Sequence, residues 1–411
     1  MSRPAVLAPL RYRDFRLLWA GMAASYAGDR LQELAQAWLV AGLTGSSALA
    51  VGAIGVIAAI PQLLMPLGGA IADLLNRRKL LIATQLAGAL AASIVGGLVV
   101  AGRSAPWQIY AWAFCSGTIW LLARPAYKVI LTQSVPMGEV RAAVAINSMT
   151  ETVLIMLVAA GGSLLLDRLG LALGFALNAA SYLIAAACLW RVPRLGEGQD
   201  QRPQADSLRR LPADLWAGFV YLWRQPRLLR PLLLTFSIVM LTTPMFGLLA
   251  AVVHAQGGTI VNLGLLSAAL GLGALIGALV AGWRGEGPQP VRLYALLGLV
   301  AAVALATFAW LPVSYLSALP LAVVGCALFS QAVWNTSRVR LAADSAYQAR
   351  LQALTTMTFT LAGAAGQAWG GVAIDRFGMP SLLVAAALLA SISVLSLMRS
   401  VRSPGIPERA R

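Results

Sequence analysis

Three ionisable side chains interrupt an apolar stretch near the N-terminus. Asp29, Arg30 and Glu33 lie in the run Gly28–Trp38, inside a segment that otherwise has the composition of a membrane-spanning helix. Placing a charged group in hydrocarbon costs several kcal/mol. These side chains are therefore expected either to serve a function or to be hidden in the protein interior.

Glu151 is a further carboxylate in an apolar segment, and no basic residue follows it on its own helix face to neutralise it. A carboxylate in a low-dielectric cavity holds a proton more readily than one in water, so it can exchange protons near neutral pH. We therefore predict Asp29, Glu33 and Glu151 as proton-coupling residues. Arg30 could instead pair with Glu33 three residues further on and hold the helix in register. Both interpretations stay open here.

Polar residues recur at helical spacing on the first, fourth and fifth span of each half of the chain. Lipid cannot satisfy hydrogen-bonding groups, so these stripes predict a polar cavity or, alternatively, interhelical hydrogen bonds alone. The third, sixth, ninth and twelfth spans are nearly plain and are predicted to face lipid or to act as scaffold. The predicted substrate-cavity residues are Ser25, Arg30, Gln32, Gln36, Trp120, Asn147, Phe246, Trp334, Asn335, Thr356, Phe359, Thr360 and Gln367.

Several other kinds of chemistry are disfavoured by the residues present. The chain has no GxxxxGK[ST] sequence, which argues against an ATP-driven pump. Cys115, Cys188 and Cys326 are scattered through predicted helices, and His254 is the only histidine. We therefore expect no metal site, no cofactor and no enzyme activity.

Composition and charge distribution predict the elements that must position these residues. Of the 411 residues, 59% are apolar and 11% are charged, whereas soluble domains carry about 25% charge. The length suits roughly twelve spans of ~20 residues. The net charge is +16, but only Arg103, Arg168 and Arg376 fall in loops that would face outside. This bias predicts a multi-pass protein of the bacterial cytoplasmic (inner) membrane with both termini in the cytoplasm, and it argues against nucleic-acid binding.

The predicted organisation is two six-helix bundles joined by a polar segment. Residues 1–190 form the first bundle, residues 191–230 a cytoplasmic linker with an interfacial amphipathic helix, and residues 231–411 the second bundle with a short tail. The predicted spans cover about residues 15–43, 48–74, 80–101, 107–125, 142–166, a sixth ending near 190, then 231–253, 261–283, 291–311, 315–336, 352–374 and 380–398.

The two predicted bundles share an internal repeat. Ala145–Gly170 aligns without a gap with Ala353–Gly378, 208 residues later, and both segments end in Asp-Arg-x-Gly. The matching segments are the fifth span of each half. Parallel repeats of six spans are expected in transporters that rock one half against the other.

Several of these residues also carry a resemblance. Gly28-Asp29-Arg30 with Ala37-Trp38-Leu39-Val40 resembles the first span of the major facilitator superfamily, and most of all its drug:proton antiporter-3, macrolide-efflux and enterobactin-exporter-like branch. Gly69-Ala70-Ile71-Ala72-Asp73 with Arg77-Arg78 is similar to the superfamily's loop between helices two and three. Arg124-Pro125-Ala126 and Ala145-Ile146-Asn147-Ser148 resemble the same branch.

The chain also departs from that family at three positions. Leu74 stands where a basic residue is usual, Val158-Ala159 replaces the Gly-Pro of the antiporter pattern, and Ile155 replaces an arginine. The loop residues Gly69, Asp73, Arg77 and Arg78 are predicted to form a conformational latch at the cytoplasmic rim, which bonds to a neighbouring helix end in one state. Positive charge that only sets the topology is the alternative.

The resemblance implies an all-α membrane protein with twelve transmembrane helices in two pseudo-symmetric six-helix bundles, the major facilitator fold. It also implies a monomeric secondary transporter in the lipid bilayer. We predict that it exports an amphipathic small molecule by alternating access, in exchange for protons. A siderophore exporter of the same fold and a transport-inactive sensor or partner protein are the alternatives.

Overall fold

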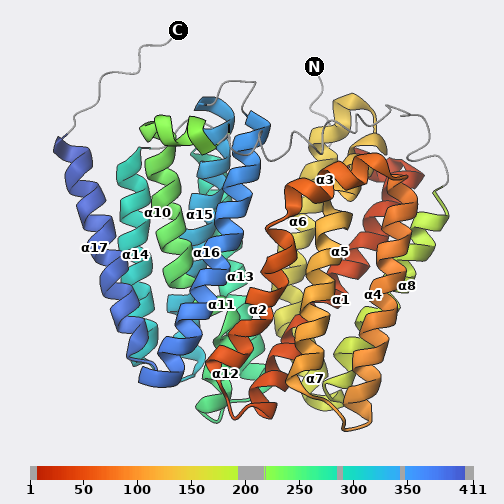
Figure 1. Ribbon diagram of the computed structural model, residues 1–411, viewed down its shortest axis with the longest axis horizontal. Coiled ribbons are helices and arrows are strands. Elements are labelled where there is room, and N and C mark those ends of the chain that lie inside the picture. The colour runs from red at the N-terminus through yellow and green to blue at the C-terminus, as the bar shows by residue number, and fades with distance from the viewer. Residues whose placement is uncertain (1–6, 193–216, 218, 285–289, 343–347, 403–411) are drawn as a thin grey trace.

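The computed structural model describes residues 7–192, 217, 219–284, 290–342 and 348–402. Helices account for its regular structure, and the described residues contain no strand. The helices stand side by side in two groups, α1–α8 and α10–α17 (Figure 1). The predicted linker lies for the most part outside the described residues, and the boundaries of the two predicted bundles stay a prediction.

In the first half, a short 3-10 turn at Ala8–Arg11 leads into the long helix α1, and further 3-10 and π-helical segments join later helices. The elements are η1 (Ala8–Arg11), α1 (Arg13–Leu43), α2 (Ala48–Gln62), α3 (Met65–Leu74), α4 (Arg77–Val100), α5 (Pro106–Gln133), η2 (Met137–Glu139), α6 (Val140–Leu157), η3 (Val158–Gly162), α7 (Ser163–Leu169) and α8 (Ala172–Trp190).

In the second half, helical residues 217 and 219–224 precede α10, and a break at Gln225 separates them from it. The elements are α10 (Pro226–Thr242), α11 (Pro244–Gly247), α12 (Leu249–Ala255), α13 (Ile260–Trp283), α14 (Val291–Trp310), η4 (Tyr315–Ser317), α15 (Ala318–Ala342), α16 (Gln348–Phe377) and α17 (Ser381–Arg402).

Two spans predicted as single helices are interrupted, and those predictions were wrong. The span at 48–74 divides into α2 and α3, next to Pro61 and Pro66. The span at 231–253 divides into α10, α11 and α12, bent by 48°. Proline explains the break between α2 and α3 and the one between α10 and α11, because it lacks the N–H that the helix needs and its ring clashes with the preceding turn. The 48° bend lies at Leu248, between α11 and α12. The span at 142–166, in contrast, is one continuous helix within Met137–Leu169, with a π-helical stretch between α6 and α7.

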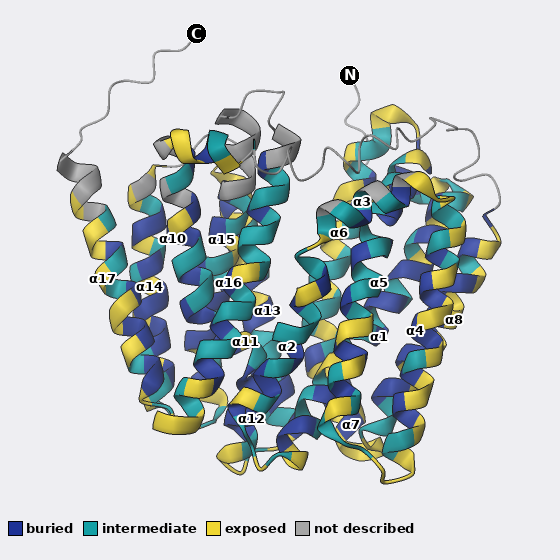
Figure 2. Cartoon of the chain, in the orientation of Figure 1, coloured by how far each residue is buried: buried dark blue, intermediate teal, exposed yellow. Residues whose placement is uncertain are grey.

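Six described helices are long and apolar enough to cross a membrane, or seven if the bent pair is one span. The remaining helices are shorter, or carry more polar and charged residues, and are packed into the same two groups. This arrangement is consistent with the twelve predicted spans, although length and hydropathy identify only these six or seven. Exposed apolar side chains on the outward faces, such as Leu86, Leu90 and Ile94 of α4, suit contact with lipid (Figure 2).

The chain begins α1 and ends α17 at the same end of the molecule (Figure 1). We call this the inner end, after the predicted orientation, and the opposite end the outer end. Gly170 and Gly378, which close the two aligned repeat segments, lie at the outer end with φ of +86° and +66°. Glycine adopts this left-handed conformation without the steric cost that other residues would have.

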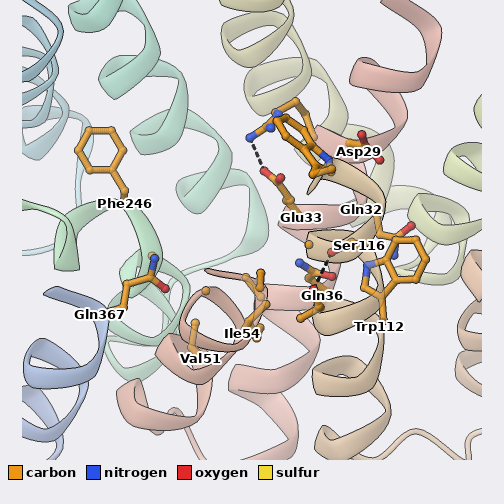
Figure 3. A pocket seen from close by; sticks show the side chains of 18 of the residues that line it. Asp29, Gln32, Glu33, Gln36, Val51, Ile54, Trp112, Ser116, Phe246 and Gln367 are labelled. Atoms are coloured by element: carbon orange, nitrogen blue, oxygen red, sulfur yellow. Dashed lines mark hydrogen bonds and ion pairs between the residues drawn. The ribbon is translucent and has the colours of Figure 1, made fainter. Parts of the chain in front are cut away.

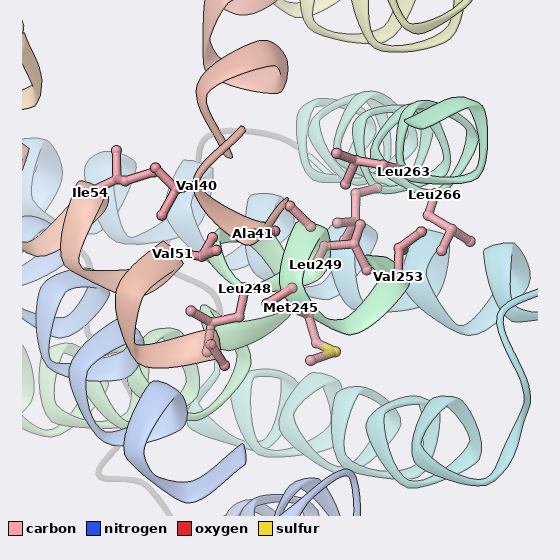
Figure 4. Packing of buried hydrophobic residues seen from close by; sticks show 14 of the residues in the cluster. Val40, Ala41, Val51, Ile54, Met245, Leu248, Leu249, Val253, Leu263 and Leu266 are labelled. Atoms are coloured by element: carbon pink, nitrogen blue, oxygen red, sulfur yellow. The ribbon is translucent and has the colours of Figure 1, made fainter. Parts of the chain in front are cut away.

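The two halves meet through an apolar cluster toward the outer end. The cluster joins α1 and α2 of the first half to α11, α12 and α13 of the second (Figure 4). Val40, Val51, Met245 and Leu249 are almost completely buried there. Burial of such side chains contributes roughly 1.5–3 kcal/mol each, so this contact holds the halves together at the outer end.

Candidate functional site

A cavity of about 430 Å³ lies between the halves (Figure 3). We call it the main cavity. Helices α1, α2, α5 and α8 of the first half provide most of its wall, and α11 and α16 of the second half complete it. Its polar lining residues are Asp29, Arg30, Gln32, Glu33, Gln36, Gln62, Ser116, Asn178 and Gln367, together with Trp112 and Trp120.

Asp29 is held by uncharged partners from α8. Its Oδ1 accepts hydrogen bonds from the Tyr182 hydroxyl at 2.6 Å and from Asn178 Nδ2 at 3.2 Å. Asn178 Nδ2 also donates to Gln32 Oε1 at 2.6 Å. Gly28 allows this close approach, because a Cβ there would lie only 2.9 Å from the Cα of Asn178. The carboxylate can therefore exchange a proton without breaking an ion pair.

Arg30 and Glu33 form the ion pair that the three-residue spacing suggested. Arg30 Nη1 and Glu33 Oε2 are 2.6 Å apart, and both side chains are partly exposed, at 29% and 48%. The Arg30 guanidinium also lies 5.8 Å from the ring centre of Trp120, within the range of a cation–π interaction. Proton uptake by Glu33 would have to compete with this pair.

Glu151 is also paired, contrary to the expectation from its own helix face. Its partner Arg124 comes from α5, with Nη2 3.5 Å from Glu151 Oε2. Asn147 Nδ2 donates to Glu151 Oε1 at 2.9 Å, and Asn147 in turn accepts from the Tyr127 hydroxyl at 2.6 Å. Arg124 lies 4.5 Å from the ring centre of Trp120. Spacing along one helix cannot reveal a partner on another, which is why this one was missed.

A small cavity of about 30 Å³ lies next to Asp29. Its walls include Ser25, Tyr26, Arg124 and Tyr182, so it reaches from Asp29 toward the Arg124–Glu151 pair. Such a volume is enough for one water molecule. Ser25 is buried here and donates to Gln85 at 3.3 Å.

A second large cavity, of about 360 Å³, adjoins the main cavity. We call it the apolar chamber. It lies between α1 and α6 on one side and α11, α12, α13 and α15 on the other. The two cavities share part of one wall: Arg30, Glu33, Ala37, Phe246 and Gly247.

The structure brings together only part of the predicted substrate-cavity set. Arg30, Gln32, Gln36, Trp120, Phe246 and Gln367 line the main cavity. Thr356, Phe359 and Thr360 of α16 line neither large cavity. Trp334 is buried against Tyr294, with ring centres 5.9 Å apart, and lines neither. The side chain of Asn335 lies outside the described residues.

Sequence reasoning missed the contribution of α8. This helix is the sixth predicted span, which was expected to face lipid or act as scaffold, yet Asn178, Ser181 and Tyr182 are all buried. The available signal was their spacing of i, i+3 and i+4, which places three polar groups on one face of an alanine-rich helix.

The predicted latch residues are only partly described. Arg78 donates from Nε to the Leu189 carbonyl at 3.0 Å and from Nη2 to the Trp190 carbonyl at 2.6 Å. It thus caps the C-terminus of α8 in its own half, where a cation is favoured. Gly69 lies on α3 with open space at its Cα, and Arg77 begins α4. The side chain of Asp73 lies outside the described residues, and the latch stays a prediction.

The halves are bonded at the outer end by what we call the outer clamp. Asp375, at the end of α16, accepts from Ser47 Oγ at 2.7 Å and from the backbone N–H groups of Ala48 at 2.6 Å and Leu49 at 3.2 Å. A carboxylate is favoured at a helix N-terminus, and here the helix is α2 of the other half. His254 Nδ1 lies 2.7 Å from Ser46 Oγ and adds a second contact.

Gln367 of α16 lines the main cavity and contacts the first half of the chain. Its amide group rests against Gly55 of α2 and Gly247 of α11. A Cβ at Gly247 would approach Gln367 Cδ to 2.5 Å, so these glycines leave the room that the amide occupies.

In the described part of the chain, no three His, Cys, Asp or Glu side chains come together as metal ligands would.

Comparison with known proteins identifies the family and the fold of this chain. The sequence model of a family described as transmembrane secretion effectors matches residues 4–407. Compared with curated proteins, the sequence matches none of them. The solved structures that share the fold at low sequence identity include the three that follow, which show the fold and not the substrate.

The first is the nucleoside transporter NupG, with a TM-score of 0.68 and 15% identity over 93% of this chain and 98% of that chain. The second is a bacterial homologue of the human lysosomal transporter Spinster, in an inward-facing and unoccupied conformation, with a TM-score of 0.68 and 14% identity over 94% and 93%. The third is a POT family transporter in complex with a conjugated peptide, with a TM-score of 0.67 and 14% identity over 96% and 97%. The chain belongs to the transmembrane secretion effector family within the major facilitator superfamily, and is thus a membrane transporter and not an enzyme.

Proposed function

We propose that this chain is a secondary active transporter that exports an amphipathic small molecule across the bacterial cytoplasmic membrane in exchange for protons. One observation carries the proposal. Among the three candidate carboxylates, Glu33 and Glu151 each face an arginine, whereas Asp29 is bonded to a tyrosine and an asparagine on the wall of the main cavity.

The balance of charges supports a cationic substrate. The pairs Arg30–Glu33 and Arg124–Glu151 neutralise one another. The remaining charge of the site is the carboxylate of Asp29, and a cation is attracted to it while a proton neutralises it. A proton and a cationic substrate compete for this one carboxylate. Because the site opens alternately to the two sides of the membrane, this competition exchanges one for the other across it.

The direction of opening is part of the proposal. The outer clamp and the apolar cluster bond the halves at the outer end, which favours access to the main cavity from the inner end. The resemblance in fold to the Spinster homologue solved in an inward-facing conformation is consistent with this. An exporter must take its substrate from the cytoplasm in such a state.

The test compares two conservative variants in proteoliposomes that contain the purified protein and the fluorescent cation ethidium. Asp29→Asn is expected to abolish ethidium transport driven by a pH gradient and to weaken ethidium binding, because it removes the carboxylate for which the proton and the cation compete. Glu33→Gln, one turn away, is the charge-matched control: it removes one negative charge from the same cavity but keeps the Asp29 carboxylate, so pH-driven transport is expected to remain. Unchanged transport by Asp29→Asn would refute the proton role of Asp29.

Two alternatives in the same fold predict different results. A siderophore exporter would bind an anionic ligand through Arg30, which lines the main cavity, and would therefore bind iron-free siderophore more tightly than ethidium. A transport-inactive sensor or partner protein would bind ligand without flux in any gradient. Direct binding and proteoliposome flux separate the three functions.

A further inference from the structure

The apolar chamber has its charged groups at one end only. Arg30 and Glu33, the charged residues in its lining, both belong to the wall that it shares with the main cavity. The Thr152 hydroxyl donates to the Ser148 carbonyl of its own helix at 2.9 Å, so it is satisfied internally. The part of the wall away from the main cavity is built largely from Leu34, Ile155, Ala159, Leu263, Leu270 and Phe329.

We propose that the apolar chamber is a separate subsite that binds the apolar part of the transported molecule, while the cationic group of the same molecule lies in the main cavity near Asp29. This inference rests on the proposed function and adds the shape of the substrate. Each cavity lies within the range of about 300–1,000 Å³ that drug-sized ligands occupy. Continuity through the shared wall lets one molecule occupy both.

Small residues of α13 set the depth of this subsite. Ser267 and Gly271 of α13 and Ile155 of α6 all line the chamber. A Cβ at Gly271 would lie 3.4 Å from Ile155 Cγ2, at ordinary contact distance. Since Ser267 and Ile155 both line the chamber, a longer side chain at position 267 would fill part of it, and a shorter one at position 155 would enlarge it.

The subsite lies between the two halves, so it changes shape when they move during transport. Its walls come from both halves, with α1 and α6 on one side and α13 and α15 on the other. Rocking of one half against the other separates these walls, so the apolar part of the substrate loses its contacts when the protein changes state. Release of the cationic group toward the outside is then completed by protonation of Asp29.

The test uses a series of n-alkyltrimethylammonium ions, from ethyl to dodecyl, as probes. Their binding to the full-length protein in lipid nanodiscs is followed by tryptophan fluorescence, since Trp112 and Trp120 line the main cavity. Each methylene group buried in the chamber is expected to tighten binding about fourfold, from roughly 0.8 kcal/mol per CH₂. The increase should stop when the chamber is full.

Two variants change the length at which this happens. Ser267→Leu is expected to weaken binding of the octyl ion about tenfold or more while changing that of the ethyl ion less than about twofold, as loss of two or three buried methylene groups implies. Ile155→Ala is expected to extend the increase by about two methylene groups. Ala269→Leu is the matched control on α13, on a stripe with the exposed residues Leu272 and Ile276, and should leave the series unchanged.

The outcomes separate this inference from the proposed function. If no ion of any length binds to the native protein, the cationic substrate class fails. If the ions bind but the dependence on chain length is the same in Ser267→Leu, Ile155→Ala and the native protein, the subsite is refuted. If the chain-length dependence is present in detergent but absent in nanodiscs, a lipid acyl chain occupies the chamber and the inference is likewise overturned.

Discussion

The outer clamp makes a quantitative prediction about the conformational equilibrium. Asp375 of α16 accepts three hydrogen bonds from the first turn of α2, two of them from backbone N–H groups. Hydrogen bonds to a charged group contribute about 1.5–3 kcal/mol each in favourable cases. Asp375 is exposed to solvent, which weakens them, and asparagine would keep one acceptor oxygen. We therefore expect Asp375→Asn to cost the closed outer end about 1–3 kcal/mol, or a roughly 5–150-fold shift toward opening.

The internal repeat supplies a matched control. Asp167 is the residue equivalent to Asp375 in the first half, but it makes no hydrogen bond or ion pair to another residue of the described chain. Asp167→Asn therefore changes the same charge at the same end without touching the clamp. It is expected to leave the equilibrium unchanged.

The opening can be measured as a distance between spin labels at the ends of α7 and α16. Leu169 and Phe377 are suitable positions, since both are exposed, at 65% and 71%, and they belong to different halves. Cys115, Cys188 and Cys326 are first replaced by alanine. Asp375→Asn should populate a longer distance that the native protein and Asp167→Asn lack. Identical distance distributions in all three proteins would refute the clamp.

Two further predictions concern stability and are checked by thermal unfolding in detergent. Gly28→Ala places a methyl group 2.9 Å from the Cα of Asn178 and should destabilise the fold by about 1–3 kcal/mol. Gly97→Ala, with open space around it, is the control and should not. Equal unfolding temperatures of the two variants would contradict the close α1–α8 contact. Arg78→Ala removes both bonds to the C-terminal carbonyls of α8 and should cost about 1–3 kcal/mol, whereas the exposed neighbour in Lys79→Ala should be neutral; a stable Arg78→Ala protein would show that this cap is unimportant.

The helix boundaries show how much of the fold can be predicted from local sequence patterns. The apolar runs and the turn residues between them predicted where most helices lie, because hydrophobic length and turn chemistry are local properties. The same patterns failed at the breaks in two spans. A proline marks a possible break, but whether neighbouring helices compensate for it depends on the packing around it, and at Leu63–Leu64 and near Pro244 they leave the helix interrupted.

The charged stretch of α1 shows most clearly what the sequence determines and what only the tertiary structure decides. From the sequence alone, Asp29, Arg30 and Glu33 are buried charges on a membrane-spanning helix, and Arg30 and Glu33 are close enough along it to pair. Which carboxylate lacks a cationic partner was decided only by tertiary structure, since Arg124 reaches Glu151 from α5, and Tyr182 and Asn178 reach Asp29 from α8. The spacing of residues along one helix fixes which side chains share a face. The rotation and approach of the neighbouring helices, which depend on packing along their whole length, fix what that face meets.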